Sequence, residues 1–163
     1  MSTIDSLIGW NHRYGGDAAQ PALRPQPRTG VAIVTCMDAR ISIPSMLGVQ
    51  PGDVHLLRNA GGLVTEDVIR SLVVSQVEFD TDEVMVIQHT GCGMEGLADR
   101  TFRDKVGTLR GRAPTFAVGG FPDAGSRVAE SVRELRQNTL LEGDVRGFLF
   151  HTDTGYVAEV PVP

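Results

Sequence analysis

Short apolar runs alternate along this chain with longer segments that carry an apolar stripe. Residues 31–35 and 84–87 are continuous apolar runs, as expected of strands buried on both faces of a sheet. Another strand is predicted over 54–57, after the turn-forming sequence Pro51-Gly52-Asp53. Strands that alternate with helices predict an α/β fold, in which a mostly parallel central β-sheet is flanked by helices.

Two helices can be placed from their caps and stripes. The first is predicted to begin at Thr65, which suits the N-cap, and to carry its apolar stripe on Ile69, Leu72, Val73, Gln76 and Val77. The second is predicted to be capped by Asp123, with core positions at Val128, Val132, Leu135 and Leu140. A short helix is expected over 100–109. Strands over 147–151 and 156–160 are expected to flank a hairpin end.

The chain of 163 residues is predicted to be a single domain, 1–163, with an N-terminal arm and loop over 1–29. The arm has apolar residues in helical spacing, and a proline-rich segment follows it. These apolar residues are Ile4, Leu7, Ile8 and Trp10. So short an amphipathic helix has little of its own domain to pack on, so we expect it to pack on a partner subunit.

The formal net charge of −5 argues against a nucleic-acid partner, because phosphate backbones attract a surplus of Lys and Arg. No apolar stretch approaches the roughly 18 residues of a membrane span. The first residues lack the pattern of a secretory signal, and we expect a cytoplasmic protein with no membrane partner.

Cys36 and Cys92 are the two cysteines, and both follow predicted strands. In a reducing compartment a disulfide between them is disfavoured, which leaves buried hydrophobes, metal ligands or nucleophiles as their roles. His89 stands three positions before Cys92. Taken alone, this pair could equally be a loop cysteine and an unrelated histidine.

The three side chains can meet only if strands 31–35 and 84–87 lie side by side, which is common in doubly wound sheets. Two thiolates and one imidazole match a catalytic zinc site with three protein ligands and one open position. This soft donor set favours Zn²⁺ over Mg²⁺ or Ca²⁺. We therefore predict that Cys36, His89 and Cys92 hold one zinc ion per chain.

Asp38 and Arg40 follow the first predicted ligand. The guanidinium can grip the carboxylate in a bidentate fork, which would leave the fourth zinc position free. Asp38 could instead reach the metal and close the site. A surface ion pair of little energetic value is the remaining interpretation.

Cys36-x-Asp38-x-Arg40 and His89-x-x-Cys92, joined by Arg58-Asn59-Ala60-Gly61-Gly62, resemble the motifs of the β-carbonic anhydrase family. The resemblance implies zinc on the two cysteines and the histidine, with an Asp38–Arg40 dyad beside it. It also implies a parallel sheet and a homodimer or homotetramer whose N-terminal helices clasp the partner. The chain is most similar to a short bacterial subgroup that also contains carbonyl sulfide hydrolases.

Three positions depart from the family pattern. Met37 and Ala39 stand where many members carry small polar residues. Gln26 does not match the register of the glutamine that contacts the substrate in many members. We therefore assign no such amide to this chain.

The resemblance implies reversible hydration of carbon dioxide to bicarbonate and a proton. Zinc lowers the pKa of bound water from 15.7 to about 7, which provides hydroxide at neutral pH. Asp38 would accept a hydrogen bond from it, and Arg40 would keep Asp38 ionised. We predict Asn59, Gly61 and Gly62 as substrate-binding residues, since glycine permits close approach to a small linear substrate. Candidate proton shuttles, by residue type alone, are His55, His12 and His151.

Three alternatives remain open at this stage. Carbonyl sulfide or carbon disulfide hydrolysis would use the same attack on a linear molecule. A non-catalytic zinc protein would have Asp38 as its fourth ligand. A thiol redox pair of Cys36 and Cys92 would require neither His89 nor the dyad.

Overall fold

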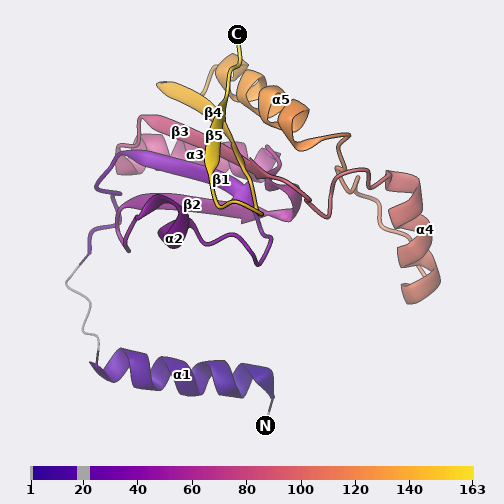
Figure 1. The fold of residues 1–163 in the computed structure, drawn as a ribbon, viewed down its shortest axis with the longest axis horizontal. Helices are drawn as coiled ribbons and strands as arrows, with labels where there is room; N and C mark the ends of the chain where they lie inside the picture. Colours follow the sequence, from indigo (N-terminus) through magenta and orange to yellow (C-terminus); the bar gives the residue numbers. More distant parts are fainter. Residues whose placement is uncertain (1, 18–22) are drawn as a thin grey trace.

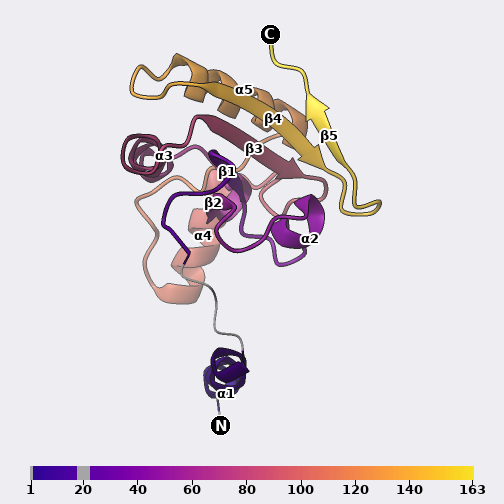
Figure 2. The ribbon, with the colours of Figure 1, turned by 90° about the vertical axis from the view of Figure 1, so that its left-hand side faces the viewer.

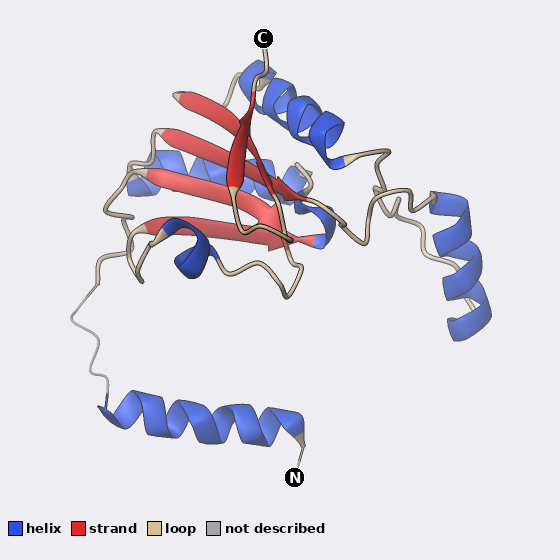
Figure 3. Ribbon diagram, viewed as in Figure 1, coloured by secondary structure: helices blue, strands red, loops and turns tan. Residues whose placement is uncertain are grey.

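A five-stranded sheet forms the centre of the protein, whose structure is a computed structural model that describes residues 2–17 and 23–163. The strand order is β2-β1-β3-β4-β5, drawn in red in Figure 3. Four parallel strands, β1 (Val31–Cys36), β2 (Val54–Asn59), β3 (Glu83–His89) and β4 (Asp144–Phe150), are followed by β5 (Val157–Val160), which is antiparallel to β4. The predicted α/β fold with a mostly parallel sheet is confirmed.

The predicted metal site requires β1 and β3 to be neighbours in the sheet, and these two strands are paired. Thr35 of β1 lies opposite Ile87 of β3, and both strands are almost wholly buried. Both strands end later than predicted, so Cys36 and His89 are the last residues of β1 and β3. The carboxyl ends of these strands therefore meet at one edge of the sheet.

Helices lie on both faces of the sheet, and the core lies in the two layers between them (Figure 2). On one side α3 (Glu66–Phe79) and α5 (Ala124–Gln137) pack against valines of β1, β3 and β4. On the other side lies the short helix α2 (Ile43–Leu47). Leu72 of α3 and Val128 of α5 are fully buried, as predicted.

The predicted helix starts are confirmed, but one residue of the α3 stripe and one core residue of the second helix are wrong. Thr65 and Asp123 cap α3 and α5 by accepting hydrogen bonds from backbone N–H groups three residues on. The buried face of α3 comprises Val68, Leu72 and Ser75, whereas the predicted Val77 is 69% exposed. Valines on several sides of this helix make neighbouring faces equally apolar. Leu140 lies beyond the end of α5 and is 67% exposed, because the helix stops at Gln137.

The remaining predicted elements are present. A hairpin connects β4 to β5 through residues 151–156, and α4 (Asp99–Arg110) occupies the place of the expected short helix. Residues of α4 are all exposed or half-buried, and the helix projects from the body of the protein (Figure 1).

The arm forms the expected helix, α1 (Thr3–Asp17), which stands apart from the sheet in Figure 1. The apolar side chains predicted to contact a partner are exposed; they are Ile4, Leu7, Ile8 and Trp10. Their packing on a partner subunit stays a prediction. The proline-rich segment expected after the arm falls partly on 18–22, outside the described residues. Among the helices that the structure describes, none has the length and apolar character needed to cross a membrane.

Candidate metal centre

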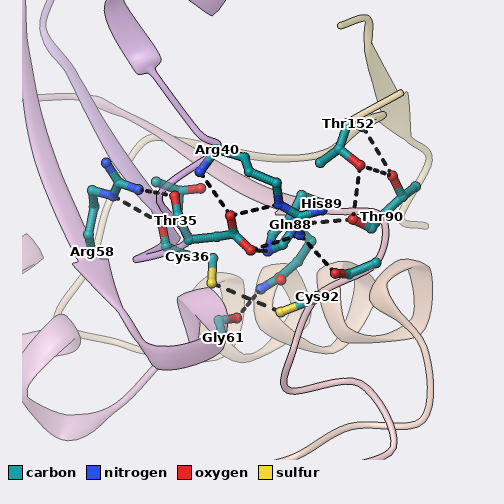
Figure 4. A network of polar contacts seen from close by, with 12 residues as sticks. Thr35, Cys36, Arg40, Arg58, Gly61, Gln88, His89, Thr90, Cys92 and Thr152 are labelled. Carbon is teal, nitrogen blue, oxygen red and sulfur yellow. Dashed lines mark hydrogen bonds and ion pairs between the residues drawn. The ribbon is translucent and has the colours of Figure 1, made fainter. Parts of the chain in front are cut away.

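Cys36, His89 and Cys92 converge at the carboxyl edge of the sheet, seen from close by in Figure 4. Cys36 and His89 end neighbouring parallel strands. Cys92 follows after a tight turn in which Gly91 has a φ of 62°, a conformation that favours glycine. Strand pairing and this turn therefore bring together three side chains that are far apart in the sequence.

The distances between the donor atoms fit a single metal ion. The two Sγ atoms are 3.9 Å apart and unbonded, and one donor atom from each residue lies within 4.8 Å of the others. With zinc–sulfur bonds of about 2.3 Å in tetrahedral geometry, two thiolates lie about 3.8 Å apart. Each of the three residues is at most 5% exposed, so water competes little for this position.

The imidazole of His89 directs a nitrogen with a free lone pair, Nε2, toward the two thiols. Its Nδ1 lies 3.1 Å from the carbonyl oxygen of Thr90, which can only accept, so Nδ1 carries the hydrogen. Nε2 is buried and lacks a hydrogen-bond partner within the described residues. Burial also lowers the pKa of His89, which favours the neutral ring. A metal ion would satisfy the lone pair on Nε2.

Burial opposes charge on the thiol of Cys92 and raises its pKa. The backbone N–H of Met94 donates a hydrogen bond toward this sulfur and partly offsets the effect. A cation between the thiols would favour the thiolate form. Residues 36, 89 and 92 therefore fit a soft divalent metal in number, spacing and chemistry.

The predicted Asp38–Arg40 pair is present beside the cluster. Oδ1 of Asp38 accepts hydrogen bonds from the backbone N–H and Nε of Arg40, both at 2.9 Å, and Oδ2 accepts one from Nη2 at 2.8 Å. These bonds hold the pKa of Asp38 well below its usual range. Oδ2 also lies 3.8 Å from Nε2 of His89, so the ionised carboxylate faces the ligand cluster.

Two arginine contacts were not foreseen from the sequence. Arg40 donates from Nη2 to the carbonyl of Gly91 at 2.9 Å. Arg58 donates to the carbonyls of Cys36 and Asp38 at 3.0 and 2.7 Å (Figure 4). Arg58 was part of the family-like motif, but no spacing rule indicates which carbonyls an arginine will bind.

The predicted substrate-binding residues lie near the cluster, and two of them have clear structural partners. Asn59 exchanges two hydrogen bonds with the backbone of Leu63, at 2.7 and 2.8 Å. Gly62 packs so closely on β1 that a Cβ atom would lie 2.8 Å from the nitrogen of Cys36. Their role toward a substrate, and that of Gly61, stays a prediction.

Gln88 supports this turn from within the protein. Its fully buried amide donates to the carbonyls of Gly61 and Gly62 at 2.7 and 3.1 Å. It was not singled out from the sequence, although a polar residue at the end of an apolar strand was a usable signal.

The three histidines considered as proton shuttles lie in different parts of the fold. Both ring nitrogens of His55 are hydrogen-bonded, to Ser75 and to the carbonyl of Pro25. His55 lies opposite Ala32 near the start of β2, about 13 Å along the strand from Asn59. His12 is on α1, and His151 begins the β4–β5 turn.

Comparison with known proteins agrees with this geometry. The carbonic anhydrase family model matches residues 31–111. Beta-carbonic anhydrase 1 of Mycobacterium tuberculosis is 38% identical over 162 residues, which cover 98% of this chain and 99% of that protein. A carbon disulfide hydrolase of Acidithiobacillus thiooxidans is 31% identical over 147 residues, covering 77% and 74% of the two chains.

A solved structure of carbonic anhydrase from Streptococcus mutans superimposes with a TM-score of 0.94 at 36% identity. The aligned region covers 99% of each of the two chains. Similarity thus extends over the whole fold as well as the motifs. On these grounds the chain belongs to the β-carbonic anhydrase family.

Proposed function

We propose that the protein hydrates carbon dioxide reversibly to bicarbonate and a proton, with one zinc ion held by Cys36, His89 and Cys92. The observation that carries the proposal is the unpartnered Nε2 of His89, among the described residues, aimed at two thiols and faced by Asp38 at 3.8 Å. The relative from M. tuberculosis, which matches over nearly its full length, supports the same reaction.

When bound, zinc would acidify a water molecule and so supply a nucleophile near neutral pH. The protein's own contribution would begin with Asp38, which would accept a hydrogen bond from that nucleophile; the 3.8 Å between its Oδ2 and Nε2 of His89 supports this role. Arg40 keeps the carboxylate ionised and oriented by occupying both of its oxygens. Burial of the two thiols and the imidazole would limit the access of bulk water to the metal ligands. Asn59, Gly61 and Gly62 are proposed to line the substrate pocket.

Hydrolysis of carbon disulfide or carbonyl sulfide is a second candidate. The similarity to the A. thiooxidans enzyme over three quarters of both chains favours it. These substrates are linear and weakly polar like carbon dioxide, so the same ligands and the same dyad serve either reaction.

Rates measured side by side on one zinc-loaded preparation, with carbon dioxide, carbonyl sulfide and carbon disulfide, test the proposal. We expect about one zinc per chain and the highest kcat/KM for carbon dioxide. Full activity in metal-free protein would contradict the zinc-dependent mechanism. Bound zinc with no turnover of any substrate would instead favour a non-catalytic site closed by Asp38.

We also propose that the exposed apolar face of α1 packs on a second copy of the chain. Sedimentation of the full chain should give a dimer or tetramer. Deletion of residues 1–17 should shift the equilibrium toward monomer, and an unchanged mass would contradict the proposal.

A further inference from the structure

The carbonyl group of Thr90 joins the candidate ligand His89 to the far end of the chain. This oxygen lies 3.1 Å from Nδ1 of His89, and Oγ1 of Thr152 donates to the same oxygen at 3.3 Å. The two contacts come from different directions, as the dashed lines in Figure 4 show. The acceptor that orients the imidazole is therefore itself held by a side chain from the β4–β5 turn.

Thr90 and Thr152 make a closed set of hydrogen bonds. The backbone N–H of Thr152 donates to Oγ1 of Thr90 at 3.1 Å, and the two hydroxyl oxygens are also 3.1 Å apart. Since the hydroxyl of Thr152 donates to the carbonyl of Thr90, the hydroxyl of Thr90 is the donor between the two side chains. Every hydroxyl hydrogen then has an acceptor, which fixes both rotamers.

Strand pairing positions this contact. His89 lies opposite Phe150 at the end of the β3–β4 ladder, and the backbone N–H of Thr90 donates to the carbonyl of Phe150 at 3.0 Å. Thr152 follows two residues later, in the turn toward β5. It lies 62 positions from Thr90 and outside the segment 31–111 that matches the family model.

We propose that Thr152 is a positioning residue for the metal site, acting on His89 through the Thr90 carbonyl. A carbonyl fixed on two sides keeps the hydrogen of His89 on Nδ1, so the lone pair of Nε2 points at the two thiols. The direct hydrogen-bond partner of a ligating histidine, here the Thr90 carbonyl, typically contributes 10–100-fold to metal affinity. Thr152 holds that partner from one bond further out, so we expect its contribution at the low end of this range. The inference rests on the proposed zinc site and extends it to the C-terminal hairpin.

The test is zinc affinity, measured by competition with a chromophoric chelator, in the full-length protein. Thr152→Val keeps the shape of the side chain and removes the hydroxyl, so we expect its zinc dissociation constant to rise roughly tenfold. Thr152→Ser retains the hydroxyl and should stay within about twofold of the unmutated protein. Thr154→Val is the matched control in the same turn, because its hydroxyl contacts only the backbone N–H of Tyr156 among the described residues, and should have no effect.

A double variant distinguishes a coupled action of Thr90 and Thr152 on zinc binding from two independent effects. If Thr90 and Thr152 act as one unit, Thr90→Val with Thr152→Val should weaken zinc binding little more than the single change. An unchanged affinity in folded Thr152→Val would overturn the inference. Failure of the unmutated protein to bind zinc would instead overturn the proposed function.

An NMR spectrum of the histidine ring protons in unmutated, zinc-loaded protein tests the first link of the inference, the bond from His89 to the Thr90 carbonyl, without any substitution that could disturb folding. A slowly exchanging proton on Nδ1 of His89 is expected. Exchange as fast as that of the exposed ring of His12 would show that the Thr90 carbonyl does not hold His89, and would overturn the proposal.

Discussion

The guanidinium of Arg40 donates from Nη2 to the carbonyl oxygen of Gly91 at 2.9 Å. The same nitrogen also binds Oδ2 of Asp38 at 2.8 Å. One side chain thus connects the loop after Cys36 to the turn between His89 and Cys92. Arg40 serves as a brace between the two ligand segments as well as a partner for the carboxylate.

Arg40→Lys should reduce kcat/KM by at least about tenfold, although the positive charge is retained. A lysine cannot bind both carboxylate oxygens and the Gly91 carbonyl in one planar arrangement. Released from the bidentate bond, Asp38 is free to turn toward the metal. The three proposed zinc ligands are unchanged, so the zinc content should stay near one per chain. The exposed Arg70–Asp67 pair of α3 provides the control, and Arg70→Lys should leave activity unchanged. Normal turnover in Arg40→Lys would show that the contacts of Arg40 with Asp38 and Gly91 are not needed for activity.

Cys92→Ser should lose zinc, because the hydroxyl is a poor substitute for a thiolate ligand. Metal analysis of the purified protein should fall from about one zinc per chain to near zero, and turnover should fall with it. Met37→Ala changes the exposed neighbour of the other cysteine and should keep its zinc. Stoichiometric zinc in Cys92→Ser would exclude Cys92 from the ligand set.

Gly62→Ala should destabilise the fold by roughly 2 kcal/mol or more. The residue has a φ of 56°, and a Cβ atom there would lie 2.8 Å from backbone atoms of Thr35 and Cys36. Displacement of Cys36 should also weaken zinc binding. Gly93 lies one residue after Cys92 and has open space around it, so Gly93→Ala should be tolerated. Thermal unfolding with and without zinc measures both effects, and equal melting temperatures for the two variants would contradict the packing argument.

The stability of the metal-free protein should fall as the pH falls below about 6.5, the usual pKa of histidine. Burial lowers the pKa of His89 in the folded state, so the unfolded chain binds a proton that the folded chain does not. Above the pKa that His89 has in the unfolded chain, its contribution to the free energy of unfolding is fully present. As the pH falls from there toward the lower pKa of His89 in the folded state, the free energy of unfolding decreases, with a slope of at most about 1.4 kcal/mol per pH unit.

His89→Asn should flatten that slope, and His12→Asn, on the exposed side of α1, should leave it unchanged. Denaturant unfolding at a series of pH values in the presence of a chelator measures it. If the free energy of unfolding keeps the same dependence on pH in His89→Asn, the proton taken up on unfolding binds to another group.

Much of this fold could be predicted because apolar runs and helix caps are local signals. Thr65 and Asp123 mark their helices by a side-chain oxygen placed before an apolar stripe, and both caps are present. Cys36, His89 and Cys92 could be joined because parallel strands end at one edge of the sheet. The rotation of α3 could not be predicted, since valines surround that helix on several sides and only tertiary packing selects the buried one.

The supporting contacts of the site were also beyond sequence reasoning. Arg58 and Thr152 bind backbone carbonyls, and a carbonyl is present at every residue, so the sequence does not distinguish one acceptor from another. Gln88 is similar, because its partners are the carbonyls of a glycine turn 26 and 27 positions away. Such contacts depend on the path of the backbone after folding.

The pairing of β1 with β3 has a consequence for the order of events during folding. Cys36 and Cys92 are 56 positions apart, and the chain between them contains β2 and α3. Closing so long a loop into a parallel pair is slow compared with forming helices or hairpins. With the proposed zinc site, a newly made chain would offer only His89 and Cys92 to the metal until that pairing is complete, so we expect tight metal binding to be a late event that marks a correctly paired sheet.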